Sequence, residues 1–194
     1  MTKLKTALTA LMLSATALMV VAPPAAAQGT VIMVIDEGRI VAESKAGKDM
    51  FTKLKNIETQ INTELKPTLD ALEAERQALA TRLDGKTREA IAADAALVKQ
   101  IGDFQKKSEE FAQKRTMLSQ EYAATEQKSF IDFNSALEPV MLEVVKEKNA
   151  QVVLSKSQAV FTADTVDATA SVVAKLDQKT PAITVVRQRA PAPK

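Results

Sequence analysis

Two kinds of residue cluster in this sequence could support chemistry: a segment containing glycine and lysine, and pairs of adjacent acidic residues. The segment SKAGK at residues 44–48 invites comparison with a phosphate-binding loop. The comparison fails, because the position five residues before Gly47 holds Ala42 rather than glycine, and Lys48 is followed by Asp49 rather than serine or threonine. We therefore predict that this segment leads into a helix and binds no nucleotide.

Adjacent carboxylates occur at Asp36 and Glu37 and at Glu109 and Glu110, and such pairs can act as a general acid and a general base. That role requires surroundings that make the two groups of a pair different. Both pairs here lie among many other charged residues. Solvent-exposed surface charge is therefore the better interpretation.

The residue types that the sequence lacks exclude much of enzyme chemistry. The 194 residues include no cysteine, no histidine and no tryptophan, and Tyr122 is the one tyrosine. Thiol catalysis, zinc sites built on thiolate or imidazole, and histidine-based triads cannot be formed. We expect a protein without enzymatic activity, cofactor or metal. Because disulfides are impossible, its stability should come from packing and oligomerisation.

The first 27 residues read as a secretory signal peptide. Lys3 and Lys5 precede an uncharged stretch rich in Leu, Ala, Met and Val, and small residues at Ala25 and Ala27 predict cleavage after Ala27. An uncleaved membrane anchor is less favoured, because about 20 apolar residues are needed to span a bilayer and this run is shorter and interrupted by prolines. The mature chain would be neutral, with 24 basic and 24 acidic residues, which argues against nucleic-acid binding.

The rest of the pattern predicts an α+β protein, mainly α, in which a small β-rich body carries a long antiparallel helical hairpin. Residues 28–47 begin the body. Within them, TVIMVI at 30–35 reads as a buried strand and 37–43 as one or two helical turns. Residues 44–47 are expected to loosen the chain before the next element.

Residues 48–148 predict a coiled-coil-like helical hairpin. Its tip is expected near 84–88, where Gly85 can take a left-handed conformation and Thr87 can cap the second helix. Apolar residues recur at helical spacing on both sides of the tip, and the second helix includes a heptad series: Phe51, Leu54, Ile57, Ile61, Leu65, Leu69, Leu72, Leu79 and Leu83, then Leu97, Phe104, Phe111 and Leu118. A stripe this narrow predicts an elongated hairpin that cannot bury a third layer.

Prolines inside both arms, Pro67 and Pro139, should bend their helices. Folding the hairpin at its predicted tip places Pro67 opposite residues 102–104. The pairing of Pro67 with Gly102 then marks either a working hinge or a passive bend.

Residues 149–186 return the chain to the body in short elements. We predict strands at 151–155 and 159–162 around a polar turn, a helix capped by Asp164 or Thr165 that carries Val166 and ends before Pro181, and an edge strand at 182–186. The last residues, RQRAPAPK at 187–194, lack apolar content and predict a mobile basic tail.

The order of these segments resembles the OmpH/Skp-like family of periplasmic chaperones. The resemblance is carried by VIMVID, EGRIVAESKAGKD and QVVLSKSQAVFTADTVDATASVVAKL at the two ends of the helical hairpin. It implies a homotrimer, in which strands of three subunits form a small β-barrel and three hairpins project like tentacles around a cavity. It also implies an ATP-independent holding chaperone in the periplasm of a Gram-negative bacterium, which binds unfolded outer-membrane proteins and prevents their aggregation.

The residues themselves support one part of this arrangement, because a helical hairpin returns the chain to its start and brings the first and last strands together. A sheet of so few strands is weak alone. Pairing of strands between subunits would complete the sheet and bury the residues of a predicted trimer body: Ile32, Val34, Val152, Leu154 and Phe161.

Contacts with unfolded clients are expected on the hairpin. Met117 lies off the apolar stripe and is the better candidate, whereas Phe104 and Phe111 lie on it and either contact clients or only hold the two helices together. Residues 50–130 carry 13 basic and 13 acidic residues, so weak distributed contact is expected rather than electrostatic capture. Peripheral contact with the membrane is left open. The alternative function is a coiled-coil spacer or adaptor that docks a folded envelope partner.

Overall fold

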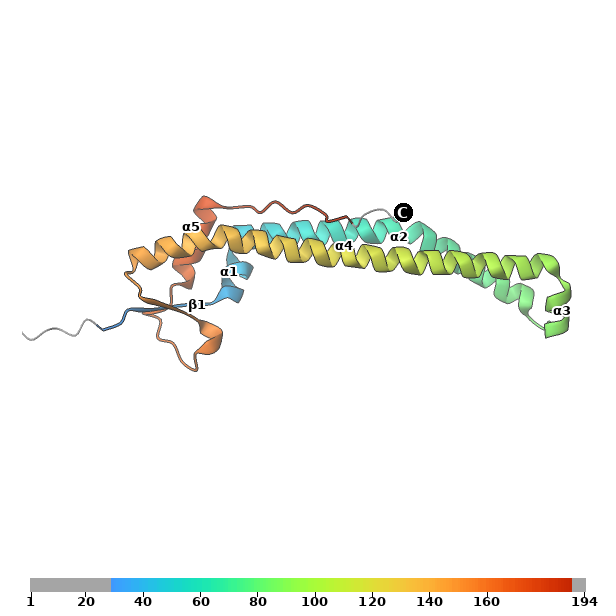
Figure 1. Cartoon of the computed structure of the whole chain (residues 1–194), viewed down its shortest axis with the longest axis horizontal. Helices are drawn as coiled ribbons and strands as arrows, with labels where there is room; N and C mark the ends of the chain where they lie inside the picture. Colours follow the sequence, from blue (N-terminus) through green and yellow to red (C-terminus); the bar gives the residue numbers. More distant parts are fainter. Residues whose placement is uncertain (1–28, 190–194) are drawn as a thin grey trace, which may run out of the picture.

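An elongated helical hairpin carries a small body at its open end (Figure 1). The computed structural model describes residues 29–189, so the predicted signal peptide and the end of the predicted tail lie outside the described part of the chain. Helix α2 (Lys45–Leu83) and helix α4 (Ala95–Glu147) run antiparallel and side by side, which confirms the predicted hairpin. No helix in the described range 29–189 is long and apolar enough to cross a membrane.

The body contains a two-stranded parallel sheet, β1 (Ile32–Ile35) and β2 (Val152–Ser155). The predicted meeting of the first strand with the strand after the hairpin is therefore confirmed. Helix α1 (Glu37–Glu43) has the predicted bounds, and helix α5 (Thr169–Lys179) packs against α1, α2 and α4.

The predicted strand at 159–162 is wrong. After β2 the chain makes one 3₁₀ turn (Lys156–Gln158) and then crosses to the far edge of β1 instead of turning back on β2. There the backbone N–H of Val34 donates to the carbonyl of Val166, and the N–H of Ala168 donates to the carbonyl of Val34, each at 2.8 Å. Both edges of β1 are thus occupied, and the outer edge of β2 carries no strand from residues 29–189.

The predicted loop at 44–47 is instead the start of α2. The Ser44 hydroxyl accepts a hydrogen bond of 3.1 Å from the N–H of Gly47 and caps the helix. A Cβ added at Gly47 would lie 1.8 Å from the carbonyl oxygen of Val41. Glycine is therefore needed here for the close approach of α1 to α2, and it does not loosen the chain.

The hairpin tip forms where it was predicted, but the second arm is not one continuous helix. Gly85 adopts a φ of +69°, and the side chain of Thr87 caps the helix that follows. That helix, α3 (Arg88–Ala93), ends after six residues. Asp94 then caps α4 by accepting a hydrogen bond of 2.9 Å from a backbone N–H one turn on, and so the helical path restarts in a new direction (Figure 1).

The chain beyond β2 departs from prediction in three further places. Helix α5 begins at Thr169 without a side-chain cap, so neither Asp164 nor Thr165 starts it, and Val166 pairs with β1 instead. Residues 180–189, which we name the C-terminal segment, are extended and run along the hairpin (Figure 1). They form no edge strand at 182–186.

The main core lies where the body meets the base of the hairpin. Apolar side chains from β1, α1, α2, α4, α5 and the C-terminal segment pack there, and they include Met33, Ile35, Ile40, Met50, Leu54, Phe133, Leu137, Val140, Val144, Val172, Leu176 and Ile183. This core fixes the direction in which the two arms leave the body.

Candidate functional site

The body exposes a set of large apolar residues, here named the apolar body surface. Its members lie at the start of the described chain, on both strands and in the segment after the 3₁₀ turn: Val31, Ile32, Val152, Val153, Leu154, Val160 and Phe161. Phe161 is 85% exposed. Side chains on both faces of β2 are exposed, which is unusual for apolar residues of a strand unless another element covers them.

Four of the five residues predicted for a trimer body belong to this surface. The exception is Val34, which is only 3% exposed because the strand edge and the residues beyond it already cover it within one chain. Val34 is therefore a core residue of the single chain rather than a residue that awaits a partner.

The two arms are joined by a thin apolar seam. A cluster of Ile57, Ile61 and Leu118 is buried near the middle of the hairpin. Farther toward the tip the arms are also bridged by ion pairs, Lys107 to Glu75 at 2.9 Å and Arg82 to Asp94 at 3.4 Å. Leu118 thus holds the helices together, as expected for a residue on the stripe.

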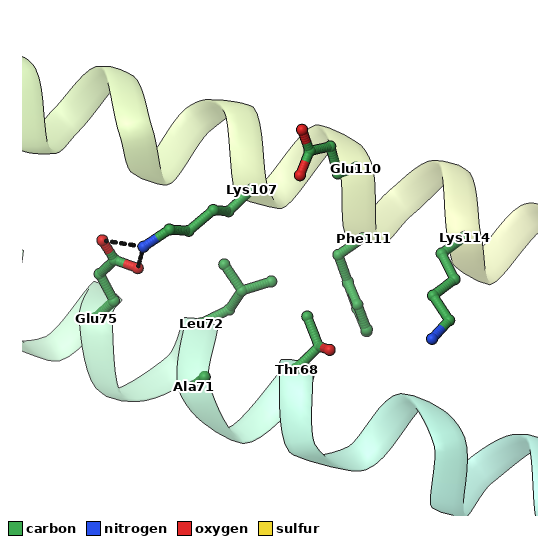
Figure 2. A pocket seen from close by; sticks show the side chains of 8 residues that line it. All are labelled: Thr68, Ala71, Leu72, Glu75, Lys107, Glu110, Phe111 and Lys114. Atoms are coloured by element: carbon green, nitrogen blue, oxygen red, sulfur yellow. Dashed lines mark hydrogen bonds and ion pairs between the residues drawn. The ribbon is translucent and has the colours of Figure 1, made fainter.

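Phe111 lines an open hollow of about 350 Å³ between the arms (Figure 2). It points from α4 toward α2 beside Thr68, and Leu72 and the Lys107–Glu75 ion pair lie to one side. Phe111 also lines a neighbouring hollow of about 410 Å³. An aromatic ring between two open hollows is accessible to an apolar guest.

The two other residues predicted for client contact are half-buried, as Phe111 is. Phe104 lies on α4, two turns before Phe111. Met117, expected off the stripe, packs against the cluster of Ile57, Ile61 and Leu118. Met117 therefore belongs to the seam of the hairpin, whereas Phe111 lines two open hollows.

The predicted pairing of Pro67 with Gly102 does not occur. Thr68, the neighbour of Pro67, lines the same hollow as Phe111 and Lys114, about ten residues beyond the predicted partner. The shift arises because α3 takes up residues at the tip before the antiparallel pairing begins. Pro67 lies inside an uninterrupted α2, and Gly102 lies inside α4.

The C-terminal segment contacts both arms, a feature that the sequence interpretation missed. Ile183 is buried in the main core, and Arg187 forms ion pairs with Glu121 at 2.8 Å and Glu64 at 3.3 Å. The N–H of Gln188 donates to the Thr125 hydroxyl at 2.8 Å. Arg187 and Gln188 are therefore held against the hairpin and do not belong to the predicted mobile tail, and the run of β-branched residues ITVV at 183–186 was the signal for an extended segment.

Charge pairing shapes the pKa of two carboxylates at these contacts. Burial acts to raise the pKa of Glu64, but hydrogen bonds from Lys114 and Arg187 outweigh it and hold the pKa below its ordinary value. In the body, hydrogen bonds from Thr169 and Lys156 hold the pKa of Asp167 well below its usual range. Both groups are thus ionised at neutral pH. Glu64 joins segments that are distant in sequence, whereas the partners of Asp167 lie in its own stretch of the chain.

Known proteins place this architecture in a family. A family model described as outer membrane protein (OmpH-like) matches residues 31–176. The crystal structure of a proposed outer membrane chaperone (OmpH-like) from Caulobacter crescentus CB15, at 2.83 Å resolution, is similar with 27% sequence identity and a TM-score of 0.70, over 83% of this chain and 92% of that one. No curated protein matches the sequence. The chain belongs to the OmpH-like family, whose members are chaperones and not enzymes.

Proposed function

We propose that this protein is an ATP-independent holding chaperone that binds unfolded outer-membrane proteins and prevents their aggregation. The observation that carries the proposal is the pair of long arms with apolar hollows open between them. Helix α2 has 39 residues, which at 1.5 Å per residue is a length of about 58 Å. Such arms present a large contact surface, and the hollows lined by Phe111 between them are open.

The working form is a homotrimer. Strand β2 has a free edge among the described residues, and the apolar body surface lies beside it. Unpaired edges and large exposed apolar patches are disfavoured in soluble proteins, so strands of neighbouring subunits are expected to cover them and form a small barrel. Ile32, Val152, Leu154 and Phe161 supply that interface, and three pairs of arms then enclose a cavity.

Holding without a nucleotide requires many weak contacts, because release then follows from mass action alone. Phe111 between its two hollows supplies an apolar contact, and the half-buried Phe104 and Met117 add to it when the arms separate. Pro67 and Gly102 remain the proposed hinge positions for that separation, and substitution of each residue tests this role. The setting is the periplasm of a Gram-negative bacterium, reached after cleavage near Ala27.

The test is aggregation of an unfolded outer-membrane β-barrel protein after dilution from urea, measured by light scattering with and without the mature protein. We expect wild-type protein to suppress scattering without ATP, and Phe111→Ser to weaken suppression. Gln113→Ser, an exposed change on the same helix, should leave it intact. Absence of suppression by wild type, together with tight binding to one folded partner, would support a spacer or adaptor instead.

Mass measurement in solution tests the trimer separately. Leu154→Glu places a charge on the apolar body surface and should convert the trimer to monomer. Gln178→Glu, on an exposed position of α5, adds the same charge elsewhere in the body and should leave the mass unchanged. A monomeric wild-type protein contradicts both the barrel and the cavity.

A further inference from the structure

The C-terminal segment lies beyond the stretch that matches the family, which ends at residue 176. Its side chains alternate along the hairpin. Ile183 is buried, Val185 packs against both the main core and the cluster in the hairpin seam, and Thr184 and Val186 face outward. Alternation of this kind is the pattern of a β-strand laid on a surface.

The hairpin holds the C-terminal segment largely through the backbone of the segment. The N–H of Ile183 donates to the Asp49 carboxylate at 3.0 Å, and the Lys53 ammonium donates to the carbonyl of Ile183 at 2.7 Å. Farther along, the Thr125 hydroxyl accepts from the N–H of Gln188. Every peptide has such groups, so these contacts recognise an extended backbone rather than one particular sequence.

The part of the hairpin surface that holds the C-terminal segment is here named the groove, and it is formed by Asp49, Lys53, Glu64, Glu121 and Thr125. Its floor is polar where the backbone of the segment lies on it. Thr125 and Ser129 are buried on α4, and each hydroxyl donates to the carbonyl one turn earlier, which leaves its lone pairs able to accept. At the far end Glu121 and Glu64 receive the guanidinium of Arg187. The groove thus receives the side chains of every second residue, Ile183 and Val185, together with backbone N–H groups. At its far end it binds a cationic side chain.

We propose that this groove, formed by Asp49, Lys53, Glu64, Glu121 and Thr125, is a binding site for one extended segment of an unfolded client, and that the C-terminal segment occupies it until a client displaces it. The inference rests on the proposed chaperone function. Transmembrane strands of outer-membrane barrels are extended and turn successive side chains to opposite faces, as the C-terminal segment does with Ile183 and Val185 inward and Thr184 and Val186 outward. A tethered competitor at high local concentration keeps each client contact weak and reversible.

The experiment uses the full mature protein and a fluorescein-labelled peptide, TPAITVVRQR, which matches residues 180–189. Arg187→Glu places a carboxylate against Glu64 and Glu121 and frees the segment, so peptide affinity measured by anisotropy should rise about tenfold or more as the open fraction rises. Arg189→Glu makes the same charge change on an exposed neighbour and should keep wild-type affinity. A peptide with serine at the two inward aliphatic positions should not bind.

A second variant closes the groove. Lys128→Cys and Val186→Cys, two positions that line one hollow beside the segment, can be bridged by a short bismaleimide in this cysteine-free protein. Bridging should abolish peptide binding, and the unbridged double variant should retain it. Equal affinity of the wild-type, Arg187→Glu and bridged proteins, or no binding by any of them, overturns the proposal.

The aggregation assay separates this inference from the proposed function. If the peptide results are as expected but wild type does not suppress aggregation, the proposed function fails and the groove remains a peptide site. If wild type suppresses aggregation equally with the groove free and bridged, and the peptide does not discriminate the two forms, the groove alone is overturned.

Discussion

The body and the distal arms differ in how their helices are held together. In the body, side chains from several elements are removed from water completely, among them Ile40, Met50 and Phe133. Between residues 65 and 115, burial among the described residues is confined to Leu72, Leu79 and Leu97, and ion pairs bridge the arms. The body therefore packs its side chains into one arrangement, whereas the distal arms leave most of their side chains exposed to solvent.

The largest expected effect comes from the body core. Phe133→Ala removes a fully buried ring and should lower the free energy of unfolding by about 3–5 kcal/mol. Leu72 borders an open hollow between the arms, so its replacement by alanine removes less packing. Leu72→Ala should lower the free energy of unfolding by about 2 kcal/mol at most. Urea unfolding followed by circular dichroism at fixed protein concentration measures both.

Ile131→Ala is the control for that pair, since Ile131 is 51% exposed on the same helix as Phe133 and should change stability little. Equal costs at Phe133 and Leu72 would mean that the arms have a core of their own, and the contrast between the two regions would be wrong.

Two glycines sharpen the comparison further. Gly47→Ala forces a methyl group against the Val41 carbonyl oxygen in the body and should destabilise by about 1–3 kcal/mol or more. Gly102→Ala meets no atom within 4 Å, and in a helix interior it should stabilise by up to about 1 kcal/mol. Thermal unfolding of the two variants should therefore shift in opposite directions. A destabilised Gly102→Ala would indicate that this position in α4 needs glycine.

The pH dependence of stability should also differ between the regions. The pKa of Asp167 is held below its ordinary value in the folded protein, and it returns to about 3.9 on unfolding. Its contribution is therefore complete above that value and is lost as the pH falls toward the folded-state pKa. The free energy of unfolding of the wild type should exceed that of Asp167→Asn by about 1 kcal/mol at neutral pH, and this difference should shrink below about pH 4.

The matched change in an arm is Asp103→Asn. A hydrogen bond from Lys99 lowers the pKa of Asp103 as well, but this pair lies on the exposed surface of α4. The pH-dependent difference in unfolding free energy between wild type and Asp103→Asn should be smaller than the difference between wild type and Asp167→Asn. A larger difference for Asp103→Asn would contradict the expectation that Asp167 in the body stabilises the protein more than Asp103 on the arm does.

The smallest effect is expected at the ion pair between the arms. Lys107→Ala removes the 2.9 Å contact with Glu75, and because the lysine side chain is more than half exposed the loss should be about 0.5 kcal/mol or less. Added salt should reduce the difference between wild type and variant. A large, salt-independent loss would show that the pair is essential to the hairpin.

Elements with strong local signals could be predicted from the sequence. The apolar periodicity gave the two arms, Gly85 marked the tip, and the run of β-branched residues marked β1. The break at Asp94 could not be predicted, because aspartate fits a helix surface as well as a cap and the surrounding alanines favour helix on both sides.

Features that depend on distant partners were missed. The apolar residues near Phe161 looked like a strand, yet the edge of β1 was taken by the residues around Asp167. Arg187 looked like part of a free tail because Glu64 and Glu121 are far away in sequence. At the candidate site, a heptad count placed Met117 off the seam, but in the folded hairpin its flexible side chain reaches the cluster.

The parallel pairing of β1 with β2 also leads to an expectation about the order in which the protein folds. Ile32 and Val152 are partners although 120 residues separate them. Closing such a loop from an unfolded chain is costly in entropy and slow, whereas the contacts between the arms are closer in sequence near the tip and can spread from there. We therefore expect the arms to form first and to bring the two strands of their own chain together.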